Sequence, residues 1–159
     1  MLARRRPIAK FYFGIYEALR QLSVESGFST LATRSLNQQG PSMKYLLLCQ
    51  IQPASFADVS PDTEAQMMAS MMAYNQQLIQ AGVLVAAGQL APADTAQRVF
   101  TQKGRIKTEE GNALTGDTQI GGYYLIDVPG ETEATGWAAK CPLVHMGSLE
   151  VRKVAYAPI

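Results

Sequence analysis

The sequence predicts an α+β fold in which two helices cover one face of a mainly antiparallel sheet. The chain has 159 residues, of which 47% are hydrophobic and 17% are charged, and these values suit a single compact domain rather than a disordered chain. Short apolar runs and two helical patterns follow one another in the order strand, helix, strand, two hairpin strands, strand, helix, strand. This order is typical of a ferredoxin-like sandwich.

The first strand and the first helix have clear boundaries in the sequence. Met43–Ile51 is a short, continuously apolar run, which favours a strand buried on both faces. A helix is expected to begin at Pro61, because proline is tolerated at the first helical position and the side chain of Ser60 can cap the first turn. It should end near Ala81, where Gly82 stops it. Its methionine-rich stripe is expected to pack across the sheet rather than to form a binding surface.

The middle of the chain predicts a second strand and a hairpin. Val83–Leu90 is expected to form the second strand. Thr95–Gln102 and Arg105–Glu109 flank Lys103–Gly104, where glycine supplies the positive φ of a tight hairpin turn. The polar segment Glu110–Thr118 that follows is expected to be a loop.

The last three elements follow the same logic. Ile120–Val128 is an apolar run fed by a double glycine, and it predicts a strand. Pro129–Glu131 begins a second helix, and Pro142 ends it. Gly147–Val154 is expected to form the last strand. The apolar face of the second helix consists of Ala134, Trp137, Ala138 and Cys141.

Both faces of the first strand are apolar. Leu46 and Leu48 should point to one face, whereas Tyr45, Leu47 and Cys49 point to the other. The two helices can cover only one of these faces, so the second face needs another cover. A face-to-face homodimer is the natural solution.

Residues 1–42 differ from the rest of the chain in charge. They carry six basic and two acidic residues, a net charge of +4, whereas residues 43–159 carry eight basic and eleven acidic residues, a net charge of −3. Three interpretations of this basic N-terminal extension remain open: a presequence, a mis-assigned start with Met43 as the true first residue, and a disordered tail. The domain itself is expected at residues 43–159, in the cytoplasm, or in the mitochondrion if the presequence is genuine.

Charge and cysteine content argue against several classes of function. The acidic main body disfavours nucleic-acid binding, and no apolar run approaches the roughly 20 residues that span a bilayer. Cys49 and Cys141 form no CxxC motif and have no histidine at metal-ligand spacing. No dinucleotide or phosphate-loop motif occurs. The sequence therefore predicts no metal and no cofactor, and no nucleic-acid or membrane partner.

Five segments carry a resemblance to a known family. They are Met43–Leu48, Ala81–Val85, Gly121–Val128, Trp137–Pro142 and Gly147–Arg152, in collinear order and with fitting spacings. Together they resemble the YCII-related (DGPF) domain family over about residues 43–155. The resemblance implies a dimer of ferredoxin-like subunits that form an α/β barrel. Family members are small proteins of largely unassigned activity, some attached to or encoded beside extracytoplasmic-function sigma factors. A few relatives are lyase-like enzymes with a His–Asp pair.

The chain departs from the family pattern in two places. The Asp-Gly-Pro-Phe tetrad corresponds to Glu110–Ala113, where only the glycine and the acidic character remain, and the acidic residue that follows corresponds to Thr115. The histidine that often precedes Gly147 corresponds to Met146, and His145 lies one position earlier. The altered 110–118 loop weakens any role that the family gives to it.

His145 is the only histidine, and therefore the only side chain that ordinarily titrates near neutrality. If it acts in catalysis, a carboxylate should be its partner, and Asp117 and Asp127 are the candidates for such an acid/base pair. The alternative interpretations are a surface residue for His145 and a helix cap for Asp127.

Tyr123 and Tyr124 point to opposite faces of their strand. One of them should lie on the dimer-facing side and could hold a ligand in a cleft, with core packing as the alternative for both. Three functions fit these observations: a lyase-like small-molecule enzyme, a non-catalytic ligand-binding or regulatory homodimer, and a structural dimer without a ligand.

Overall fold

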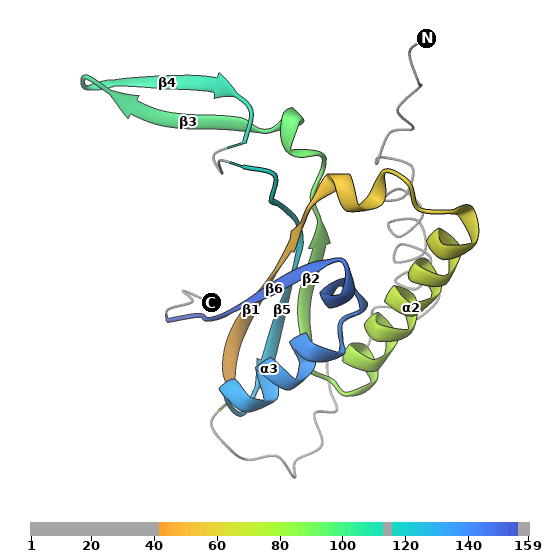
Figure 1. Cartoon of the computed structure of the whole chain (residues 1–159). Coiled ribbons are helices and arrows are strands. Elements are labelled where there is room, and N and C mark those ends of the chain that lie inside the picture. The colour runs from red at the N-terminus through yellow and green to blue at the C-terminus, as the bar shows by residue number, and fades with distance from the viewer. Residues whose placement is uncertain (1–41, 113–115, 156–159) are drawn as a thin grey trace, which may run out of the picture.

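The structure is a computed structural model that describes residues 42–112 and 116–155 (Figure 1). The basic N-terminal extension, apart from Ser42, lies outside these residues. Two helices and six strands lie within them, together with three short 3₁₀ helices at Pro53–Phe56, Ala93–Thr95 and Pro142–His145. The helices and strands are β1 (Met43–Ile51), α2 (Pro61–Gln80), β2 (Leu84–Gln89), β3 (Gln97–Gln102), β4 (Arg105–Glu110), β5 (Gln119–Val128), α3 (Glu131–Lys140) and β6 (Gly147–Lys153).

Four of the strands form one antiparallel sheet in the order β2-β5-β1-β6, and β3 pairs with β4 in a separate two-stranded sheet. Helix α2 connects β1 to β2, and α3 connects β5 to β6, so each helix joins two strands that are not neighbours. The predicted α+β fold and its ferredoxin-like character are therefore confirmed. The β3–β4 hairpin projects away from the sheet and the helices (Figure 1).

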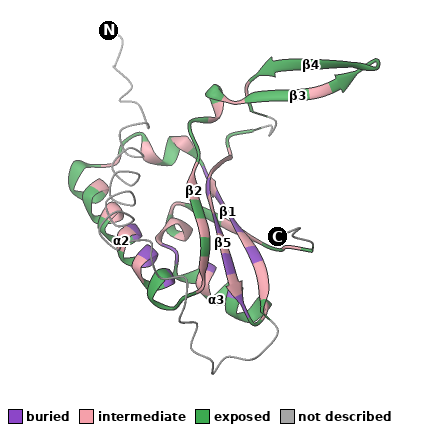
Figure 2. Ribbon diagram, turned by 180° about the vertical axis from the view of Figure 1, so that it is seen from behind, coloured by how far each residue is buried: buried purple, intermediate pink, exposed green. Residues whose placement is uncertain are grey.

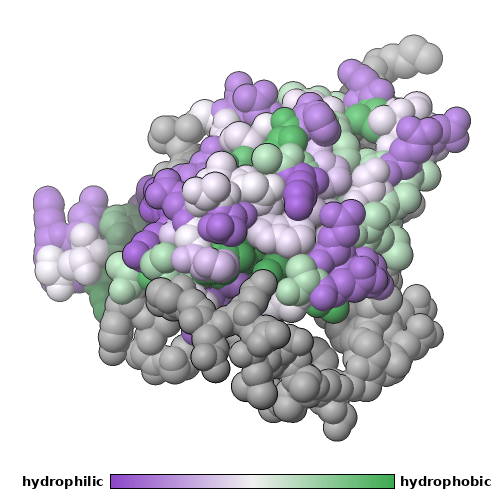
Figure 3. Space-filling view, turned by 90° about the horizontal axis from the view of Figure 1, so that it is seen from below, coloured by the Kyte–Doolittle hydropathy of each residue, from purple (hydrophilic) through white to green (hydrophobic). Residues whose placement is uncertain are grey.

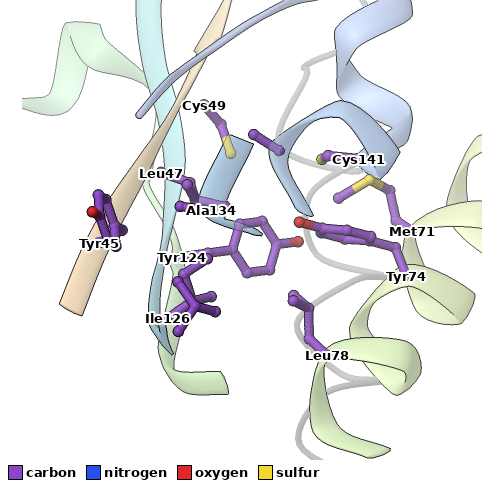
Figure 4. Packing of buried hydrophobic residues seen from close by; sticks show 12 residues of the cluster. Tyr45, Leu47, Cys49, Met71, Tyr74, Leu78, Tyr124, Ile126, Ala134 and Cys141 are labelled. Carbon is purple, nitrogen blue, oxygen red and sulfur yellow. The ribbon is translucent and has the colours of Figure 1, made fainter. Parts of the chain in front are cut away.

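The core lies between the sheet and the two helices. Every second residue of β1 and β5 is buried, because side chains alternate between the faces of a strand (Figure 2). From the helices, Met71, Tyr74 and Leu78 of α2 and Ala134 and Ala138 of α3 meet these residues (Figure 4). The helix stripe predicted to pack across the sheet consists of Met67, Met71, Tyr74 and Leu78. The last three are buried, and Met67 at its start is half-buried. The buried strand residues are Tyr45, Leu47, Cys49, Ile51, Tyr124, Ile126 and Val128.

The ends of α2 are those that the sequence predicts. The hydroxyl of Ser60 accepts a hydrogen bond of 3.2 Å from the backbone N–H of Thr63, which satisfies a donor of the first turn. Gly82 follows the helix with φ +67°, a left-handed conformation that glycine adopts without a steric cost. Helix α3 begins differently, because its N-cap residue is Gly130, which has no side chain. Asp127 lies inside β5, so its alternative interpretation as the helix N-cap is wrong.

The hairpin forms where it was predicted, with small shifts at both of its outer ends. Lys103 and Gly104 have φ of 50° and 73°, and two positive φ values are the geometry of a tight primed turn. Thr95 is not part of β3, because its hydroxyl donates a 2.6 Å hydrogen bond to the carbonyl of Pro92 within a 3₁₀ turn. Glu110 is the last residue of β4 rather than the first residue of the loop.

The chain leaves the main sheet and returns to it at one place. The backbone N–H of Leu90, just after β2, donates a 2.9 Å hydrogen bond to the carbonyl of Gly121 in β5. The segment between these two residues contains the hairpin and the 110–118 loop, of which residues 113–115 lie outside the described part.

Candidate functional site

The face of the sheet that points away from the helices has an apolar centre. In the register of β1 and β5, Leu46 lies opposite Leu125 and Leu48 lies opposite Tyr123. All four side chains are half-buried, and they alternate with the buried residues that face the helices. We call this surface the outer face. Its composition agrees with the expectation that the sheet is apolar on both sides.

A network of polar side chains borders this apolar centre on the β6 side. The amide nitrogen of Gln50 donates a 2.8 Å hydrogen bond to Oε2 of Glu150, and the Ser148 hydroxyl donates one of 3.2 Å to the Gln50 amide oxygen. Arg152 Nε lies 2.5 Å from Oε1 of Glu150 and forms an ion pair with it. Both carboxylate oxygens of Glu150 are therefore engaged. We call these four residues the Glu150 cluster.

The strand register explains why these four residues meet. Across the β1–β6 pair, Gln50 lies opposite Ser148, Leu48 opposite Glu150, and Leu46 opposite Arg152. The cluster therefore lies on the same face of the sheet as Leu46 and Leu48. Side chains directly opposite each other on neighbouring strands are close enough to touch. Charge-assisted hydrogen bonds such as that of Arg152 to Glu150 are stronger than neutral ones. The cluster is thus a preformed polar group beside an apolar surface.

Only one of the two predicted ligand tyrosines lies on the outer face. The ring of Tyr123 lies over Gly88 of the neighbouring strand β2, since a Cβ added to Gly88 would be 2.6 Å from the Tyr123 ring atom Cε1. Tyr124 points to the helices instead and is only 6% exposed. Its hydroxyl donates a 2.8 Å hydrogen bond to Oδ1 of the buried Asn75, and its ring meets that of Tyr74 edge-on at 5.4 Å (Figure 4). Burial raises the pKa of Tyr124, so it is a neutral core residue.

The structure does not bring His145 and Asp127 together. Asp127 lies opposite Lys44 at the start of β1. His145 lies just before Gly147, which is opposite Ile51 at the end of β1. The seven residues of strand between these positions span about 23 Å. Within one subunit these two side chains cannot form an acid/base pair.

Asp117 and His145 lie toward the same end of the sheet. Asp117 precedes Gln119, which is opposite Ile51 on one side of β1, and His145 precedes Gly147, which is opposite Ile51 on the other. Both residues are exposed, and neither side chain has a hydrogen bond or an ion pair with another residue in the described ranges. This end of the sheet is therefore compatible with a pair, but the pair is not formed.

Residues 43–156 match the family model of the YCII-related domain. The chain belongs to the YCII-related domain family. The match covers more than half of the chain and confirms the family that the five sequence segments indicated. In a comparison with curated proteins, none matches the chain.

The two cysteines of this YCII-related domain belong to its core. Cys49 and Cys141 are buried free thiols. Burial raises the pKa of Cys49 to about 12, with the neighbouring Cys141 adding to the effect, and it raises the pKa of Cys141 to about 11. Both thiols are therefore protonated at neutral pH and are poor nucleophiles. Within residues 42–112 and 116–155, no group of three or more His, Cys, Asp or Glu side chains could hold a metal ion.

The sequence did not single out the Glu150 cluster of the YCII-related domain as a site. The alternation along Gly147–Val154 already placed Glu150 and Arg152 on one face of the last strand. Gln50 could also have pointed to the cluster, since it is a polar residue near the end of an otherwise apolar run. What the sequence could not show is that these segments, 100 residues apart, are neighbours in the sheet. In the described part of the chain, no helix is both long and apolar enough to cross a membrane.

Proposed function

We propose that this YCII-related domain is a non-catalytic homodimer that binds a small molecule between its subunits. The observation that carries the proposal is the Glu150 cluster, a preformed polar network beside an apolar surface on the sheet face that neither α2 nor α3 covers. Apolar sites with a few fixed polar groups are typical of small-molecule binding. Two copies related by a two-fold axis would cover the apolar centres of both outer faces, in the arrangement expected of a dimeric barrel.

The chemistry of the cluster indicates what the ligand carries. Arg152 uses one N–H on Glu150, and its side chain remains 66% exposed. A guanidinium has five N–H donors, so several remain free to bind a second acceptor group, such as a carboxylate or a phosphate of a ligand. The hydroxyl of Tyr123 lies on the same face but toward β2, at the opposite edge of the sheet from Arg152. A small metabolite with a carboxylate or phosphate group fits the free donors of Arg152.

The test is a thermal-shift screen with small carboxylates and phosphates on the full chain. Compounds that bind should raise the melting temperature of the wild type, because a ligand stabilises the state to which it binds. The Arg152→Gln variant should lose this shift. Lys153→Gln removes a neighbouring positive charge from the opposite side of the strand, and it should keep the shift. An unresponsive wild type, or an equal shift in Arg152→Gln, would contradict the proposal.

The dimer is tested separately by light scattering during size-exclusion chromatography. We expect the mass of two chains. Leu48→Glu places a charge in the apolar centre of the outer face and should yield monomers, since an unpaired charge is costly to bury. A wild type that elutes as a monomer would refute the covering of the outer face by a second copy.

A lyase-like enzyme is the second candidate, and one observation favours it. His145 and Asp117 lie toward the same end of the sheet, where substrate binding could bring them together. Asp127 is too far from His145 to serve within one subunit. Compounds that shift the melting temperature should then be consumed by the wild type and not by His145→Ala. Equal turnover in both proteins would eliminate His145 as the acid/base group.

A further inference from the structure

In the described part of the chain, the hairpin β3–β4, residues 97–110, forms an arm that stands outside the four-stranded sheet. Its strands pair only with each other, and each is six residues long, which corresponds to about 20 Å. All residues of β4 and all but Phe100 of β3 are exposed (Figure 2). An isolated two-stranded hairpin is marginally stable in water. We call this hairpin the arm.

The two faces of the arm differ in kind. In the β3–β4 register, Val99 lies opposite Thr108 and Thr101 lies opposite Ile106, so these four β-branched residues share one face. Val99 is 65% exposed and Ile106 is 79% exposed, which is unusual for a pair of neighbouring apolar side chains. We call this the apolar face of the arm.

The opposite face is covered by its own side chains. Arg98 lies over the ring of Phe100, with its guanidinium carbon 4.9 Å from the ring centroid. The same arginine forms an ion pair of 2.5 Å with Glu109 on the facing strand. The charged face is thus complete in one chain, whereas the apolar face has no partner in the described part of the chain.

The charges of the described domain indicate what covers the apolar face. The arm has four basic and two acidic residues, a net charge of +2, whereas the other described residues have four basic and nine acidic residues, a net charge of −5. Hydrophilic side chains cover much of the body surface shown in Figure 3. The arm points away from its own body, so it cannot use this complementarity within one chain (Figure 1). The charged residues of the arm are Arg98, Lys103, Arg105, Lys107, Glu109 and Glu110.

We propose that the arm of one subunit docks with its apolar face on the body of a second copy of this chain. The proposal rests on the homodimer proposed above and adds a second interface to it. In a two-fold symmetric pair both arms make the same contact, so each dimer buries two apolar arm faces. Opposite charges on arm and body speed and orient the association.

The test compares two variants of the full chain by analytical ultracentrifugation. Val99→Thr/Ile106→Thr makes the apolar face polar and keeps the β-branched shape that favours a strand. Gln102→Thr lies on the opposite face and is the matched control. The double variant should raise the Kd of the dimer by roughly tenfold or more, because apolar burial is lost in both arms. The control should leave the Kd unchanged. Raising the salt concentration from about 0.05 M to about 0.5 M should also raise the wild-type Kd.

Hydrogen exchange gives a second readout that does not depend on the variants. Arm amides should be protected at concentrations where the dimer forms and should lose protection on dilution. Two results would overturn the proposal: an unchanged Kd in Val99→Thr/Ile106→Thr, or arm amides that exchange equally fast at all concentrations. Docking of the arm on an unrelated protein in place of a second copy would overturn it as well. Failure of the small-molecule proposal appears elsewhere, as a wild type that no carboxylate or phosphate stabilises.

Discussion

Tyr124→Phe tests how much the buried polar contact between sheet and helix contributes to stability. The substitution removes only the hydroxyl that donates the 2.8 Å hydrogen bond to Oδ1 of Asn75, and it leaves the edge-on contact with the Tyr74 ring in place. Asn75 is 2% exposed, so water cannot replace the lost donor. Leaving a buried acceptor unsatisfied costs about 1–3 kcal/mol.

The assay is equilibrium unfolding in urea, with thermal unfolding as a check. The transition midpoint should fall with an unchanged denaturant slope, and the melting temperature should fall by roughly 4–10 °C. Asn75→Leu should cost a similar amount, because it leaves the Tyr124 hydroxyl unpaired. The double variant Tyr124→Phe/Asn75→Leu should cost less than the sum of the two, since both partners are then apolar.

Tyr74→Phe is the matched control for this cycle. It removes a hydroxyl that donates to the backbone carbonyl of Trp137 at 3.1 Å and makes no hydrogen bond to Asn75. Its coupling with Asn75→Leu should therefore be smaller than that of Tyr124→Phe, although the Tyr74 ring contacts Tyr124. A Tyr124→Phe protein as stable as the wild type, or a double variant whose cost equals the sum, would refute the assignment of this stability to the hydrogen bond.

Two further predictions concern close packing and buried thiols. Gly147→Ala should destabilise the domain by at least about 2 kcal/mol, because its Cβ would lie 2.2 Å from the backbone oxygen of Gln50. Gly136→Ala, which meets nothing within 4 Å inside α3, should instead stabilise it by about 0.5–1 kcal/mol, and chemical denaturation of both variants checks the contrast. The folded pKa values of Cys49 and Cys141, about 12 and about 11, lie above the ordinary value of 9.0, so the stability from the protonated thiols is fully present below pH 9 and declines as the pH rises toward these values. Urea midpoints at about pH 8 and about pH 10 should show this decline, with a smaller decline in Cys49→Ala, and a flat profile would contradict it.

Local patterns predicted the elements well because each has its own signal. Met43–Ile51 forms a strand with the predicted bounds, since a short apolar run before a proline leaves few alternatives. The bounds of other strands differ from the prediction by one or two residues, as in β2, which was predicted at Val83–Leu90 and lies at Leu84–Gln89. Val83 precedes β2, although its carbonyl accepts a hydrogen bond of 2.8 Å from the N–H of Asp127.

The candidate site was less predictable because it depends on which strands are neighbours. Asp127 and His145 both lie near ends of strands in the sequence, and only the register shows that these are opposite ends of the sheet. Gln50 and Glu150 are joined for the same reason, through the pairing of β1 with β6. Nothing local to either segment encodes that pairing. The DGPF segment and the dimeric barrel implied by the family stay predictions.

The 2.9 Å hydrogen bond between Leu90 and Gly121 makes this point of the sheet an insertion point. The segment between Leu90 and the start of β5 at Gln119 leaves the sheet and returns to it at the same place, so its length can change without altering the register of β2 and β5. The entropic cost of a longer closed loop grows only slowly with length. The segment 91–118, which ends before β5 begins, can therefore be exchanged for another of different length while the four-stranded sheet stays the same. The hairpin can then vary independently of the outer face of the sheet.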